Sequence, residues 1–90
     1  MPKLSFVWDL EDDPDGNVAH IAEHGVTPEE VEEVLEAEHG SATTSRSSGN
    51  PIVFGWTQTG KYIAVVFEEV DDDPPTVYPI TAYETQPPAS

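Results

Sequence analysis

The chain has 90 residues and no cysteine, and its 18 Asp and Glu outnumber three Lys and Arg to give a formal net charge of −15. This charge argues against binding to nucleic acid or to an anionic membrane surface, because both depend on clustered Lys and Arg. The length suits a single domain, and the apolar runs are too short to cross a bilayer. We therefore expect one domain over residues 1–84, a flexible tail over 85–90, and a cytoplasmic protein without a signal peptide or disulfides.

A short strand and a short helix are predicted at the start of the chain. Residues 4–8 are aromatic and β-branched, which favours a strand, and the Asp-rich segment 9–17 is typical of a turn. Asp13 or Asp15 is expected to cap the helix that follows. The apolar stripe of this helix has helical spacing: Val18, Ile21 and Ala22. Gly25 suits the position after the helix, where φ is positive.

The second helix has a strong start pattern. Thr27 is the expected N-cap, Pro28 occupies the first helical position, and Glu30 completes a Thr-x-x-Glu capping box. Val26 can pack against Val31 as a hydrophobic staple. The predicted buried stripe consists of three apolar residues: Val31, Val34 and Leu35. We expect the helix to end at Gly40.

The second half of the chain is strand-like. Residues 41–50 are small and polar, which fits a loop or a weak edge strand, whereas residues 52–57 alternate with period two. Thr59 and Gly60 indicate a hairpin turn. Residues 62–70 are almost continuously apolar at first, so we expect a central strand that is covered on at least one face.

The last predicted strand follows an acidic loop over residues 71–75 and covers residues 76–84. Pro79 interrupts it and indicates a sheet edge or a bulge, because proline cannot donate a ladder hydrogen bond. The fold class is therefore α+β: a β-α-α unit followed by a three- to four-stranded antiparallel sheet, with two short helices packed on one face.

Several short motifs follow one another between residues 4 and 84. They are Phe6-Val-Trp-Asp9, Asn17, His24-Gly25-Val26, Pro28-Glu29-Glu30-Val31, Ile52-Val-Phe-Gly55-x-Thr57-x-x-Gly60-Lys61, Val65-Val66-Phe67 and Ile80-Thr81-Ala82. Their order and spacing resemble the BrnT family of toxin–antitoxin ribonucleases. The resemblance implies a RelE-like fold, cleavage of messenger RNA in active members, and neutralisation by a BrnA-type antitoxin.

The basic residues of active family members are largely absent. Their places hold Glu23, Asn50, Trp56 and Tyr83, and the tail has no basic residue. We therefore expect a catalytically degenerate domain that binds protein, because so acidic a surface attracts positively charged partners. The partner is predicted to be an antitoxin-like or other basic protein, or a second copy of the chain.

The alternative hypothesis is a metal-independent endoribonuclease without a cofactor. Such a reaction needs a base, an acid and a cation that stabilises the transition state. The candidate residues are His24, Lys61 and Arg46, with Tyr83 as the acid.

Two further patterns suggest metal binding. His20-Ile-Ala-Glu23-His24 matches the His-x-x-Glu-His zinc motif, with His20 and His24 as ligands, but a third ligand must come from elsewhere. The segment Glu11-x-Asp13-x-Asp15-Gly16 resembles the start of a calcium loop, although Ala22 stands at its twelfth position. The simpler interpretations are a helix-terminating histidine and a solvated turn.

The aromatic residues leave two interpretations open. Trp8, Phe54, Trp56, Tyr62 and Phe67 have no neighbouring Lys or Arg pattern that would favour stacking on nucleic-acid bases. They are therefore expected to be core residues or an apolar patch for another protein.

Overall fold

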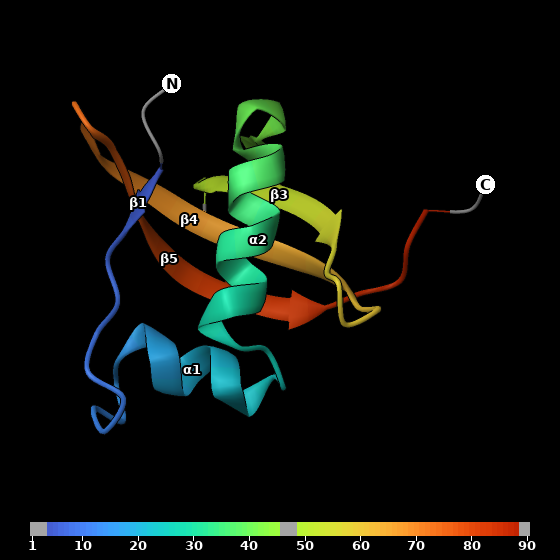
Figure 1. The fold of residues 1–90 in the computed structure, drawn as a ribbon, viewed down its shortest axis with the longest axis horizontal. Coiled ribbons are helices and arrows are strands. Elements are labelled where there is room, and N and C mark those ends of the chain that lie inside the picture. Colours follow the sequence, from blue (N-terminus) through green and yellow to red (C-terminus); the bar gives the residue numbers. More distant parts are fainter. Residues whose placement is uncertain (1–3, 46–48, 89–90) are drawn as a thin grey trace.

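The computed structural model describes residues 4–45 and 49–88, which form five strands and two α-helices. In chain order the elements are β1 (Ser5–Phe6), α1 (Asn17–Glu23), α2 (Pro28–Glu38), a 3-10 turn η1 (His39–Ser41), β2 (Thr43–Thr44), β3 (Pro51–Trp56), β4 (Tyr62–Asp72) and β5 (Pro75–Glu84). The sheet order is β1-β5-β4-β3-β2, α2 crosses one face, and α1 lies beside β5 (Figure 1). The α+β class is confirmed. No helix in this part of the chain is long and apolar enough to cross a membrane.

The sheet itself differs from the predicted antiparallel sheet of three or four strands, because it has five strands and is mixed. β1 pairs parallel with β5, with Ser5 opposite Thr76 and Phe6 opposite Val77, whereas the other pairs are antiparallel. Almost the whole chain separates β1 from β5, so no hairpin forces them to run antiparallel. β1 is also shorter than the predicted strand over residues 4–8; only the Val7 N–H extends its ladder, to the Val77 carbonyl at 2.9 Å.

The predicted start of α1 is wrong. Its N-cap is Gly16 rather than Asp13 or Asp15, and no side chain of the cap residue bonds to the helix. Asp9, from the preceding loop, accepts a hydrogen bond from the Asn17 N–H at 3.0 Å and so replaces the local cap. A Cβ at position 16 would lie 2.7 Å from the Asp9 Cβ, so this close approach requires glycine.

The end of α1 agrees better with the sequence. Gly25 follows the helix with a φ of 75°, as predicted. Of the expected apolar stripe, however, only Ile21 is buried, while Val18 is half-buried and Ala22 is exposed. A helix of seven residues therefore contributes a single fully buried apolar side chain to the core.

α2 begins as predicted. The Thr27 side chain accepts from the Glu30 N–H at 3.2 Å, and the Glu30 carboxylate accepts from the Thr27 N–H at 3.0 Å. The whole predicted stripe is buried: Val31, Val34 and Leu35. Gly55 lets the helix approach the sheet, because a Cβ there would lie 3.0 Å from the Val34 Cγ1. The helix ends at Glu38 with His39 as its C-cap, and Gly40, which was predicted to close the helix, lies in the 3-10 turn that follows.

The predicted β3–β4 hairpin is confirmed. The Thr57 N–H donates to the Lys61 carbonyl at 2.8 Å, and Gly60 adopts a φ of 89°. β4 is the central strand of the sheet and has 11 residues. β2 is a short edge strand, one of the two predicted alternatives for its segment, of which residues 46–48 lie outside the described residues.

The β4–β5 hairpin is tighter than predicted. Asp71 pairs with Thr76 and Asp72 with Pro75, so most of the expected loop over residues 71–75 belongs to the two strands. Pro79 lies opposite Phe67 at a register shift, which confirms the predicted bulge.

The two faces of the sheet are covered differently. On the helix side, side chains of both helices and of β3, β4 and β5 form the main core: Ile21, Val26, Val31, Val34, Leu35, Val53, Ile63, Val65, Phe67, Val77 and Ala82. On the opposite face a smaller cluster is formed by Ile52, Ala64, Val66 and Ile80, and no helix covers it in the described structure (Figure 1). The second face is therefore the one that the helices leave open.

Candidate functional site

Three of the four residues predicted for a ribonuclease site gather at the connection between α1 and α2. His24 is the C-cap of α1, and its ring lies 6.3 Å from the Tyr83 ring between centroids. Lys61, just after the β3–β4 turn, donates from Nζ to the Gly25 carbonyl at 2.7 Å. Arg46 lies outside the described residues. The fold thus places His24, Tyr83 and Lys61 in one region.

The Lys61 ammonium is held by protein groups. Besides the Gly25 carbonyl, it contacts the Glu30 Oε1 at 3.3 Å, and the same carboxylate accepts from the Thr27 N–H and the Thr59 hydroxyl. Burial alone would raise the pKa of Glu30, but hydrogen bonds from Thr59, Thr27 and Lys61, with the lysine charge, outweigh burial and lower that pKa below its usual value. The ionised carboxylate therefore neutralises the ammonium that a phosphate would need.

The two histidines of the predicted zinc motif lie on one side of α1. The rings of His20 and His24 meet edge to face with centroids 5.3 Å apart, and both side chains are exposed. Within residues 4–45 and 49–88, no group of three or more His, Cys, Asp or Glu side chains is arranged to hold a metal ion. The histidines therefore have no third ligand there. In the predicted calcium loop, the Asp13 carboxylate instead accepts from the Asp15 N–H at 3.0 Å.

A polar network that the sequence did not predict joins the β1–α1 loop to β5. The Asn17 amide donates to the carbonyls of Val7 at 3.0 Å and Pro79 at 2.9 Å, and its Oδ1 accepts from the Asp9 N–H at 2.8 Å. The Tyr78 hydroxyl donates to the Asp9 carboxylate, and this bond raises the pKa of Tyr78 to about 12 and lowers the pKa of Asp9. Every Asn17 amide atom is bonded, so the network is structural. No local motif predicts its links to β5, because Pro79 and Tyr78 are more than 60 residues from Asn17 and Asp9.

The aromatic residues divide between core and surface. Phe67 is buried and Trp8 is half-buried, with its Nε1 donating to the Glu32 carboxylate at 2.8 Å. Phe54 and Trp56 of β3 are exposed, at 43% and 58%. Both contact the half-buried Tyr62, which stacks on Phe54 with a centroid distance of 6.3 Å and meets Trp56 at 5.2 Å. We call Phe54, Trp56 and Tyr62 the aromatic patch.

The aromatic patch lies on the face of the sheet that the helices leave open. Phe54 is opposite Ala64 and Trp56 is opposite Tyr62 in the β3–β4 register, and directly opposed residues point to the same face. The first residues of the tail pass beside it: the Thr85 N–H donates to the Tyr62 carbonyl at 2.8 Å. Gln86 and Pro88 line a shallow hollow together with Phe54 and Tyr62. The sequence left open whether these aromatics were buried, because both faces of the strands are apolar.

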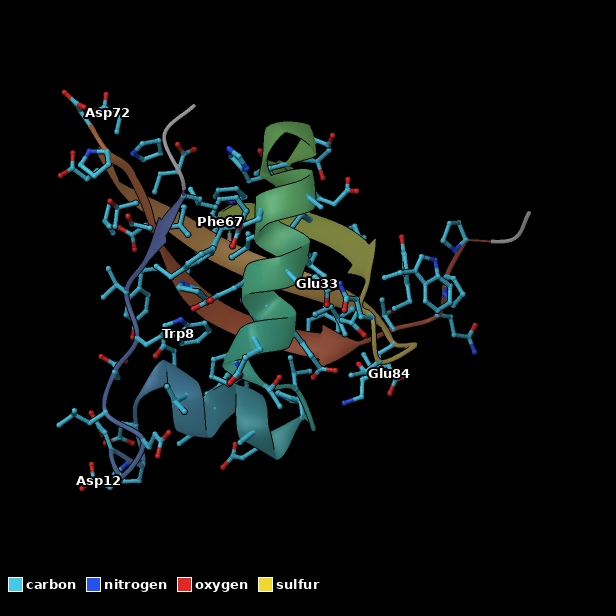
Figure 2. The ribbon with its side chains drawn as sticks, in the orientation of Figure 1. Trp8, Asp12, Glu33, Phe67, Asp72 and Glu84 are labelled. Carbon is cyan, nitrogen blue, oxygen red and sulfur yellow. The ribbon has the colours of Figure 1, made fainter. Side chains whose placement is uncertain are left out.

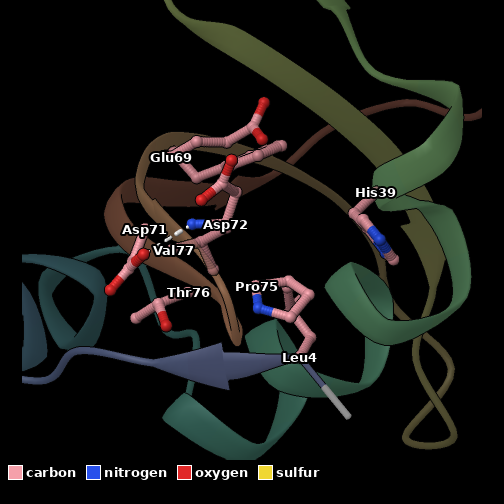
Figure 3. A pocket seen from close by; sticks show the side chains of 9 residues that line it. Leu4, His39, Glu69, Asp71, Asp72, Pro75, Thr76 and Val77 are labelled. Atoms are coloured by element: carbon pink, nitrogen blue, oxygen red, sulfur yellow. Dashed lines mark hydrogen bonds between the residues drawn. The ribbon is translucent and has the colours of Figure 1, made fainter. Parts of the chain in front are cut away.

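An acidic hollow lies at the other end of the sheet, around the β4–β5 hairpin. Its volume is about 260 Å³, with Phe67 and Val77 among its apolar lining residues (Figure 3). Glu69, Asp71 and Asp72 line the same hollow, and His39 approaches it from the end of α2 (Figure 3). Further carboxylates lie around the periphery of the molecule, among them Asp12 and Glu84 (Figure 2). The acidic character extends over much of the surface rather than marking this hollow alone.

The sequence matches no protein-family model, no curated protein and no solved structure. The BrnT-like resemblance therefore stays a prediction. Two features of the molecule bear on function: a predicted catalytic region whose lysine is neutralised, and an aromatic patch on an open sheet face.

Proposed function

We propose that this chain is an acidic, catalytically degenerate BrnT-like domain that acts by binding another protein. The aromatic patch is the observation that carries the proposal, because two large aromatic side chains are exposed on an apolar sheet face. Exposed apolar patches of this kind are typical of interaction surfaces, and aromatic residues are enriched at the centres of protein interfaces. The charge of −15 favours a basic partner, antitoxin-like or other.

The neutralised lysine supports the loss of catalysis. Glu30 and the Gly25 carbonyl together occupy the Lys61 ammonium, whose side chain is 33% exposed. Freeing it for a phosphate would leave Glu30 without its cation, beside the other carboxylates of α2. Lys61 is thus better suited to fixing the β3–β4 turn against the helix connection than to stabilising a transition state.

A metal-independent endoribonuclease is the second candidate function. The observation that favours it is the ring contact between His24 and Tyr83, which puts a base and an acid within reach of one ligand, with Lys61 bonded to the residue after His24.

Affinity capture with matched variants tests the proposed interaction. The double variant F54S/W56S removes the exposed aromatics, and Val70→Ser removes another exposed apolar side chain, 49% accessible, elsewhere on the sheet. We expect wild type and Val70→Ser to capture the same basic protein from cell extract and the double variant to lose it. Identical capture by all three proteins would contradict a role for the aromatic patch.

A cleavage assay separates the two functions. Purified protein is incubated with unstructured RNA at low salt, with and without EDTA, beside His24→Ala and Lys61→Ala. The proposal expects no cleavage by wild type. EDTA-resistant cleavage that both substitutions abolish would overturn it and establish the ribonuclease.

A further inference from the structure

Within residues 4–45 and 49–88, no strand pairs with the outer edge of β3 over its second half. β2 pairs only with the first two residues of β3, with Thr43 opposite Ile52 and Thr44 opposite Pro51. The Thr57 N–H points to β4, where it donates to Lys61. Because backbone groups alternate in direction along an antiparallel strand, the N–H and C=O of Phe54 and Trp56 point away from β4. No other strand of the described structure lies beside them.

Within residues 53–56, the strand itself lacks three of the devices that usually protect a sheet edge. Residues 53–56 include no charged residue and no proline, and their register with β4 has no bulge. Natural proteins guard such edges with charges, proline, bulges or a covering element, because an unpaired edge readily recruits another strand. The unguarded segment is therefore suited to pairing with an extended chain.

The two sides of the edge have opposite chemistry. On the open face the aromatic patch presents the exposed rings of Phe54 and Trp56. On the helix side, the Cγ of Glu38 lies 3.4 Å from the point where a Cβ of Gly55 would be, and the Glu33 carboxylate accepts from the Gln58 N–H at 3.0 and 3.1 Å. Side chains of an added strand would alternate between an apolar and an anionic surface.

We propose that the free edge of β3 binds an extended segment of a partner protein as an additional strand, in which apolar residues alternate with Lys or Arg. This inference rests on the proposed function and names the class of partner segment. Strand addition supplies affinity through the backbone groups of Phe54 and Trp56, and the alternating side chains supply specificity. A second copy of the chain suits the edge poorly, because each copy carries a charge of −15 and brings its own Glu33 and Glu38.

A synthetic peptide tests the proposal directly. The probe is a short, end-blocked peptide in which Lys alternates with Val and Ile, and its control has the same composition in a non-alternating order. We expect the alternating peptide to bind about tenfold more tightly, because only its pattern matches the two sides of the edge. Equal affinity for the two peptides would overturn the proposal, since it would indicate charge attraction alone.

Matched variants locate the binding site. Trp56→Lys and Val70→Lys change the net charge equally at exposed strand positions, so only the first is expected to weaken binding, by about tenfold. Glu33→Gln and Glu38→Gln should weaken it several-fold, whereas Glu36→Gln, at an exposed position of α2, should not. Equal effects within each set would contradict binding at this edge.

Hydrogen exchange provides a readout of strand addition. On saturation with the alternating peptide, the Phe54 and Trp56 amides should exchange more slowly, because their outward N–H groups become bonded. Unchanged exchange at both positions, or a wild-type protein that is already a dimer paired through β3, would overturn the inference. If the alternating peptide does not bind but the aromatic patch still captures a partner, the proposed function is retained and strand addition is rejected. If neither binding is observed, the proposed function is rejected as well.

Discussion

The covered and open faces of the sheet use the same strands in different ways. On the covered face, Phe67 of β4 is buried beneath the helices, whereas Phe54 of the neighbouring β3 is exposed on the open face. The polar side chains that anchor the helices also lie on the covered side: Asn17 fixes the start of α1, and Glu30 fixes the start of α2. The covered face therefore specifies the fold, and the open face is the one that we propose as an interaction surface.

Substituting one phenylalanine on each face gives the largest expected contrast. Phe67→Ala should reduce the free energy of unfolding by about 3–5 kcal/mol, because it leaves a cavity in the main core. Phe54→Ala should reduce it by less than about 1 kcal/mol, because the ring is already partly in water. Urea unfolding of both variants measures the difference.

The same two variants also test the proposed interaction surface, with partner capture in place of stability as the measurement. Phe54→Ala should impair partner capture while leaving the protein folded, and Phe67→Ala should impair capture only to the extent that the protein unfolds. A similar loss of stability for the two variants would show that the open face is a second structural core rather than an interface.

Asn17→Ala should have the next largest effect. It removes both amide donors, one from the buried backbone carbonyl of Pro79 and one from the partly buried carbonyl of Val7, together with the acceptor for the Asp9 N–H. Leaving such groups unsatisfied should cost about 2–3 kcal/mol in unfolding free energy. Gln86→Ala, at an exposed position beside the open face, is the matched control and should be neutral. A neutral Asn17→Ala would mean that water replaces the amide without loss.

The parts of the fold that the sequence predicts are those with local causes. Thr27 and Glu30 are three residues apart, so the capping box could be recognised, and Gly60 marks the β3–β4 turn. Pro79 likewise indicated the bulge from its chemistry alone. The parallel pairing of β1, the bond from Asn17 to Pro79 and the bond from Tyr78 to Asp9 depend on partners more than 60 residues away, and no local pattern encodes them.

The sequence predicted which residues form the candidate site better than it predicted the interactions that those residues make. The resemblance drew attention to His24, Lys61 and Tyr83, which the fold does bring into one region. It did not reveal that Glu30, expected only as a helix cap, also neutralises Lys61. The aromatic patch was one of two open alternatives, because both faces of residues 52–56 and 62–67 are apolar and only the position of α2 decides which is buried.

The smallest expected effect concerns pH and the Glu30 anchor on the covered face. Because its pKa is lowered on folding, ionised Glu30 stabilises the protein above the unfolded-state pKa of about 4.5, and this contribution is lost as the pH falls through the lower folded-state value. Glu30→Gln should therefore cost about 1 kcal/mol at pH 7 and progressively less under acidic conditions. Glu36→Gln, exposed on the same helix, is the control: its difference from wild type in unfolding free energy should not shrink as the pH falls. Denaturant unfolding across this pH range measures both differences, and a Glu30→Gln cost that stays constant with pH would mean that shape rather than charge holds α2 and Lys61 together.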